Sequence, residues 1–66
     1  VIMVILDEMP KTGQFVMIWQ HNGVIWSETR KWEDGKLWYF LEGVDEWNIY
    51  VDGQNSMNNI KYVVTA

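Results

Sequence analysis

Short turn signals separate the apolar runs of this 66-residue chain, and they constrain its fold more than any other feature. Asn22-Gly23, Asp34-Gly35 and Asp52-Gly53 are typical of tight β-hairpin turns, because asparagine, aspartate and glycine tolerate a positive φ. A fourth signal runs from Pro10 to Gly13. Turn signals that recur every 10 to 20 residues or so, between apolar runs, are typical of an all-β domain.

We therefore expect a single domain over residues 1–66, folded as a small antiparallel meander of about five or six strands that forms a compact barrel or sandwich. Valine, isoleucine and aromatic residues dominate the apolar runs, which suits a pleated surface. One short helix is compatible with the segment near residue 56, where Ser56 is an acceptable N-cap. The expected strands cover residues 1–6, 14–21, 24–32, 36–41, 47–51 and 60–65.

The two central turns also predict the strand register. A two-residue type I′ turn at Asn22-Gly23 places Trp19 opposite Trp26, and the same turn at Asp34-Gly35 places Glu33 opposite Lys36. Directly paired residues share a face of the sheet, so one face collects most of the large apolar side chains and is the expected core. Its members are Phe15, Met17, Trp19, Val24, Trp26, Trp32, Leu37, Tyr39 and Leu41, interrupted by Glu28 and Arg30.

The opposite face is also more apolar than a solvated face of an antiparallel sheet. It carries Val16, Ile18, Ile25, Trp38 and Phe40 around a polar middle of Ser27, Thr29 and Lys31. One explanation is that the remaining strands fold over this face and bury it. The other is that the face is exposed and binds a partner, because contiguous exposed apolar area marks interaction sites.

Length and composition limit how the domain can be stabilised. A chain this short hides only about 60% of its unfolded surface on folding. It has no cysteine and one histidine, which excludes disulfides and a structural zinc site, and we expect no cofactor or metal. Oligomerisation or dense aromatic packing is therefore expected. Nine acidic and five basic residues give a net charge of −4, which argues against a nucleic-acid partner.

The first six residues, VIMVIL, are apolar but far fewer than the roughly 18 needed to cross a bilayer. They also lack the basic flank of a signal peptide. We expect a soluble protein with no membrane partner. The absence of cysteine is compatible with a cytoplasmic location.

No combination of residues in the sequence is typical of an active site. His21 is the only imidazole, and Asp7-Glu8 and Asp45-Glu46 are adjacent pairs that alternate faces in a strand or are solvated in a turn. Glycine-rich phosphate loops and calcium loops are absent as well. We therefore expect that the protein is not an enzyme.

One segment of the chain has a recognisable layout. Pro10 is followed three residues later by Gly13, then by an apolar strand that starts at Phe15, a hairpin, and a tryptophan in the following strand, either Trp32 or Trp38. In this layout, residues 8–40 resemble a group of small phage and prophage proteins of unknown function. The resemblance implies a compact β-fold and an accessory role in a bacteriophage or mobile element, and it transfers no site residues.

The sequence thus predicts a non-enzymatic interaction module that binds a host protein or a second copy of itself. The expected binding residues are Ile18, Ile25, Trp38 and Phe40, followed by Asp45, Glu46 and Trp47. Two alternatives stay open. One is a small-molecule binding module whose aromatic cleft stacks a sugar or a nucleotide. The other is a small structural protein of a virion.

Overall fold

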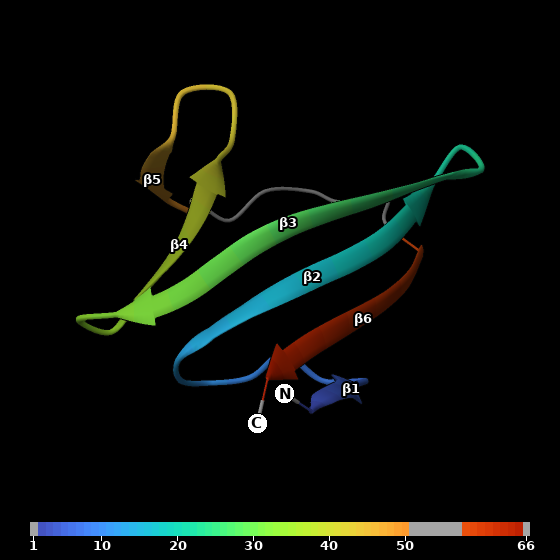
Figure 1. Ribbon diagram of the computed structural model, residues 1–66, viewed down its shortest axis with the longest axis horizontal. Coiled ribbons are helices and arrows are strands. Elements are labelled where there is room, and N and C mark those ends of the chain that lie inside the picture. The colour runs from blue at the N-terminus through green and yellow to red at the C-terminus, as the bar shows by residue number, and fades with distance from the viewer. Residues whose placement is uncertain (1, 51–57, 66) are drawn as a thin grey trace.

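The computed structural model describes residues 2–50 and 58–65. Six strands form one antiparallel sheet in the order β1-β6-β2-β3-β4-β5 (Figure 1). This confirms the predicted all-β class and places every expected strand to within about three residues. The strands are β1 (Met3–Leu6), β2 (Gln14–His21), β3 (Val24–Glu33), β4 (Lys36–Leu41), β5 (Glu46–Ile49) and β6 (Asn58–Thr65).

The short helix expected near residue 56 is not supported. Its proposed N-cap, Ser56, lies outside the described residues, while Asn58 and Asn59, which the helix would include, belong to β6. β6 pairs with β2 from Asn58 onward. Pairing with a neighbouring strand therefore determines the conformation of this segment, despite its polar sequence.

Both central turns have the predicted geometry. Asn22 and Gly23 have φ values of 53° and 75°, and Asp34 and Gly35 have 54° and 71°. Positive φ at both central residues is the mark of a type I′ turn. The register follows as predicted, with Trp19 opposite Trp26 and Glu33 opposite Lys36.

The expected barrel or sandwich is not confirmed, because the sheet is open and β1 and β5 form its two edges (Figure 1). In one of the two explanations for the second apolar face, the remaining strands fold over it. Instead, β6 inserts between β1 and β2 and pairs with both, which extends the same sheet. The N-terminal strand thus finds its partner within the chain, at the far end of the sequence.

The core lies on the predicted face of the sheet, called here the core face. Phe15 and Met17 are each 2% exposed, and the Tyr62 ring packs edge-on against Phe15 with ring centroids 5.9 Å apart. This confirms the expected core position of the first two residues. Partly buried side chains around this cluster are Leu6, Met9, Trp19, Trp32, Leu37, Ile60 and Val64.

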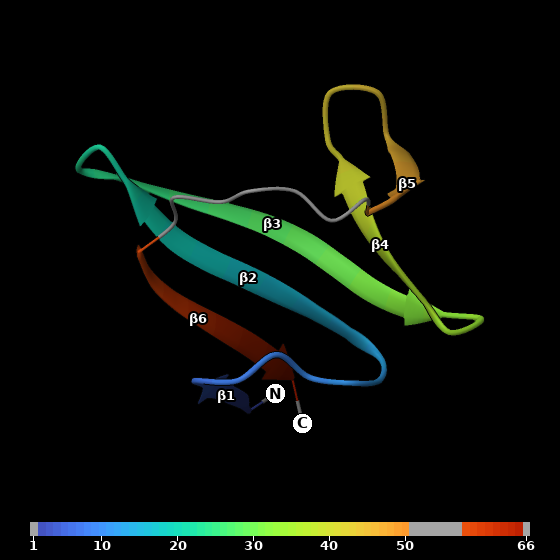
Figure 2. The ribbon, with the colours of Figure 1, turned by 180° about the vertical axis from the view of Figure 1, so that it is seen from behind.

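The connection between β1 and β2 covers part of the core face. It passes in front of β6 in Figure 2 and brings Met9 onto the core cluster. Trp32 on β3 fixes this connection twice: its indole Nε1 donates to the Pro10 carbonyl at 2.7 Å, and its backbone N–H donates to the Gly13 carbonyl at 2.9 Å. These two hydrogen bonds hold the β1–β2 connection, which has few apolar residues of its own, over the core face.

Arg30 lies at the centre of the core face, where Phe15 is its neighbour on β2 and Tyr39 its neighbour on β4. The residue is only 3% exposed. Its Nε donates to the Glu28 carboxylate at 2.8 Å, and its guanidinium carbon lies 4.4 Å from the centroid of the Tyr50 ring. A buried charge needs such partners, because an unpaired one is strongly destabilising.

Three residues expected in the core are exposed instead, namely Val24, Trp26 and Leu41. Trp26 lies on the predicted face, but it is 48% exposed. Its part of β3 pairs only with β2, since the pairing with β4 covers Arg30 to Glu33 alone. The predicted face of Trp26 was therefore right, but its predicted burial was wrong. An apolar face is buried only where other elements lie across it.

We expect Arg30→Met to lower the free energy of unfolding by about 2 kcal/mol, because it leaves the partly exposed Glu28 carboxylate without its partner. Replacing both residues, as Arg30→Met with Glu28→Leu, should recover most of the loss. Urea denaturation measures both effects. The matched control is Lys61→Ala, which breaks an exposed ion pair with Asp7 and should change stability by about 0–1 kcal/mol. Equal losses for Arg30→Met and Lys61→Ala would contradict a structural role for the buried pair.

Candidate functional site

Three aromatic side chains gather at the β4–β5 hairpin, on the side of the sheet opposite the core face, called here the outer face. Trp38 and Phe40 are alternate residues of β4 and therefore point to the same side, and Phe40 is paired with Trp47 on β5. The Phe40 and Trp47 rings are 5.1 Å apart between centroids and tilted by 59°. Such a pair adds about 0.5–1.5 kcal/mol beyond its buried area.

A lysine completes this group. Lys31 is paired with Trp38, and its Nζ lies 4.3 Å from the centroid of the Trp47 ring. The same ammonium is 3.7 Å from the Glu33 carboxylate. The Trp38 indole donates to the Glu33 carbonyl at 3.3 Å. We call Lys31, Trp38, Phe40 and Trp47 the Trp38 cluster, and all four of its members are half-buried.

The outer face has no second layer among the described residues. The core residues and the β1–β2 connection lie on the other side, and several outer-face side chains are largely exposed, including Met3, Ile25 and Ile49. The question left open by the sequence, which of the two faces is buried, is therefore answered for the part of the chain that the structure describes.

Two of the predicted binding residues share this face without touching the cluster. Ile18 is paired with Ser27, and Ile25 is 74% exposed near the β2–β3 turn. Ile25 and Lys31 are six positions apart on β3, which corresponds to about 20 Å along a strand. The predicted residues therefore form a compact cluster at one end of the sheet and a separate apolar strip at the other.

The two predicted acidic residues lie at the edge of the cluster and not within it. Asp45 is an exposed turn residue with φ of 53°. Glu46 is paired with Leu41, so it points toward the core-face side, opposite to Trp47. They form a charged border at the end of the β4–β5 hairpin.

Sequence reasoning treated Lys31 as part of a polar middle and did not include it among the binding residues. Its reach across β4 to Trp47 is a diagonal contact between strands that are not adjacent. The sequence did indicate that Lys31 lies near the cluster, because the predicted register put Lys31 beside Trp38. What the pattern lacked was the placement of β5.

The described residues contain no cluster of candidate metal ligands. The His21 imidazole interacts with the adjacent Asn22 amide, whose Nδ2 lies 3.3 Å from its Nε2. No three His, Asp or Glu residues among those described gather to hold a metal ion. Within residues 2–50 and 58–65, no helix could cross a membrane.

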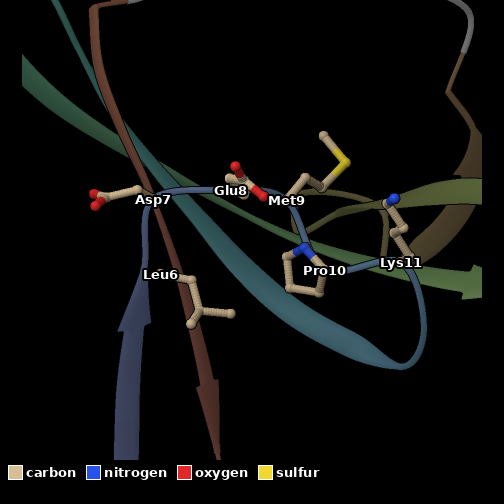
Figure 3. Close-up of a pocket in the computed structure, with 6 residues that line it drawn as sticks. All are labelled: Leu6, Asp7, Glu8, Met9, Pro10 and Lys11. Carbon is tan, nitrogen blue, oxygen red and sulfur yellow. The ribbon is translucent and has the colours of Figure 1, made fainter.

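An open hollow of about 500 Å³ lies along the β1–β2 connection (Figure 3). Six consecutive residues, 6–11, line it, so it is the inner side of a loop and not a site assembled from several elements. The Asp7 carboxylate points away from Lys11 and pairs with Lys61. The hollow therefore presents no converging set of polar groups to a ligand.

Comparison of the chain with protein-family models, with curated proteins and with solved structures found no match. The geometry of the surface is therefore the guide to the function.

One polar group near the cluster is not satisfied. Asn48 lies between Trp47 and Ile49 on β5 and points to the core face beside Tyr39. Its amide Nδ2 is buried and finds no hydrogen-bond partner among the described residues. A buried donor without a partner reduces stability by about 1–3 kcal/mol.

We expect Asn48→Val to raise the free energy of unfolding by about 1 kcal/mol, because it removes the unpaired donor and because valine is favoured in β-strands. Thermal denaturation followed by circular dichroism measures the change. The matched control is Gln14→Val, an exposed strand position where the effect should stay within about 0.5 kcal/mol. A loss of stability in Asn48→Val would mean that the amide has a stabilising role.

Proposed function

We propose that the protein is a non-enzymatic protein-binding module and that the Trp38 cluster is the centre of its binding surface. The observation that carries this proposal is a pre-ordered group of three aromatic rings and a lysine on a sheet face that no described element covers. Tryptophan is among the residues most enriched at binding hot spots. Rings that are already held in place lose little conformational freedom when a partner binds.

The shape of the surface favours a protein over a small molecule as the partner. Small-molecule sites are concave and enclose most of their ligand. Two hollows lined by described residues lie elsewhere, one along the β1–β2 connection and one near Met3 and Val63. An aromatic patch with a charge at its border has the general layout of a protein interface. Asp45 supplies such a charge at one end of the cluster, in the turn before β5.

The resemblance of residues 8–40 to small phage and prophage proteins adds a context to the proposal. It supports a bacterial host protein as the partner and the host cytoplasm as the place where the two meet. In this proposal the module modulates the partner by occupying part of its surface.

We expect Trp38→Ala to weaken binding of the partner by about 1 to 4 kcal/mol while thermal unfolding stays cooperative. The partner is first identified by affinity capture from bacterial lysate and then purified, and its dissociation constant is measured by calorimetry. Trp26→Ala is the matched control, since it removes an exposed tryptophan from the core-face side. It should leave the affinity nearly unchanged.

Two results would overturn the proposal. Equal losses of affinity for Trp38→Ala and Trp26→Ala would show that the cluster is not the binding surface. Loss of folding in Trp38→Ala would make this tryptophan a structural residue of the β4–β5 hairpin.

A further inference from the structure

The outer side of β1 is a free strand edge. β1 forms backbone hydrogen bonds with β6 on one side, and no described residue pairs with it on the other (Figure 1). In an antiparallel strand, the amides and carbonyls of alternate residues point to this unpaired side. They form a template on which another strand can be added.

This edge lacks the features that usually prevent pairing with another chain. Residues 2–6, IMVIL, contain no charge, proline or glycine, and the Ile5 side chain is 69% exposed. Protected edges carry charges, prolines or bulges. The opposite edge is of that kind, because β5 begins with Glu46 and follows the turn residue Asp45.

The exposed area of the chain leaves room for one interface. The molecule exposes 5188 Å². A monomeric globular protein of its mass, 7.9 kDa, exposes about 4,400 Å². The difference is close to the roughly 800 Å² that each partner buries in an interface of standard size.

We propose that β1 pairs with β1 of a second copy in antiparallel orientation, about a two-fold axis at Val4, and joins the two sheets into one. With this axis, Met3 lies opposite Ile5 of the second copy, and Ile2 lies opposite Leu6. All five residues of the uncharged segment are then paired. An axis at Ile5 would instead place Asp7 opposite Met3.

The net charge of the chain favours a dimer through the two uncharged β1 edges over a dimer through other surfaces. Each chain carries a net charge of −4, so most contacts between two copies bring carboxylates together. In the proposed pairing, the two Asp7 residues lie beyond the paired segment at opposite ends. An isologous contact of this type closes on itself and gives a dimer, not a fibre.

A hollow on the outer face adjoins the proposed contact. It measures about 270 Å³ and lies between β1, β6 and β2. Met3 is one of the residues that line it, and in the pairing described above Ile5 of the second copy lies beside Met3. The exposed Ile5 side chain of the second copy thereby reaches the hollow. This contact adds to the backbone hydrogen bonds between the two β1 strands. The residues that line the hollow are Met3, Gln14, Phe15, Val16, Val63 and Thr65.

Cysteine cross-linking tests the register directly, because the chain has no cysteine of its own. Opposed residues of antiparallel strands have Cα atoms about 4.5–5.5 Å apart, within the range that a disulfide spans. We expect that mild oxidation links either Val4→Cys to itself or an equimolar mixture of Met3→Cys and Ile5→Cys. Ile25→Cys, at an equally exposed outer-face position, is the control. The proposal would be overturned if neither Val4→Cys nor the mixture of Met3→Cys and Ile5→Cys formed disulfides faster than the control.

A charge introduced on the edge tests the dimer in solution. We expect the unmodified protein to be a dimer by light scattering at high concentration, and Ile5→Lys to raise the dimer dissociation constant by about tenfold or more. Ile25→Lys makes the same change on the same face, away from β1, and should have no effect. Circular dichroism confirms that both variants remain folded, and Met3→Lys repeats the test.

A protein that stays monomeric, or a dimer that Ile25→Lys disrupts and Ile5→Lys does not, would overturn the proposal. These results are separate from those on the Trp38 cluster. The Trp38→Ala variant should keep the dimer whether or not it binds a partner.

Discussion

The burial of Arg30 is the interaction on which the rest of the arrangement depends. A guanidinium at the centre of an apolar face needs a carboxylate and further contacts, and Glu28 and the Tyr50 ring supply them. Tyr50 follows β5 and also packs against Tyr39 on β4, with ring centroids 6.4 Å apart. The β4–β5 hairpin therefore directs its tyrosines toward the arginine. Because side chains alternate along a strand, this orientation sends Trp38, Phe40 and Trp47 to the opposite side.

The aromatic residues of this small chain thus have two separate roles. Those on the core face pack with one another or fix backbone, as Trp32 does for the β1–β2 connection. Those on the outer face form a cluster with a lysine at the end of the sheet. A 66-residue domain cannot bury all of its aromatic side chains in one small core, so their distribution between the faces determines which of them are available to a partner.

The sequence was enough to predict the strands and the register of β2, β3 and β4. The reason is local: an Asn-Gly or Asp-Gly turn determines the pairing of the two strands beside it. It was not enough to place β6 between β1 and β2, because this pairing joins the ends of the chain and no turn specifies it. The burial of Trp26 was misjudged for the same reason, since burial depends on elements that are distant in sequence.

The candidate site shows the same division. Trp38 and Phe40 were assigned to the outer face from the turn at Asp34-Gly35, and Trp47 joins them through the pairing of β4 with β5. The sequence grouped Glu46 with these rings, and the register places it on the other side. It also missed Lys31, whose contact with Trp47 crosses a whole strand. Alternation along one strand is readable from sequence, whereas contacts across several strands are not.

The position of β6 between β1 and β2 also has a consequence for the order in which the chain acquires its structure. The hairpins of β2, β3 and β4 join neighbouring segments and can form as soon as those segments are synthesised. β1 has to wait for residues 58–65, because its only partner in the described sheet lies there. Until then, one of the most apolar segments of the chain is exposed on the nascent polypeptide. The ribosome and the chaperones near it therefore encounter β1 as an unpaired strand until residues 58–65 have emerged.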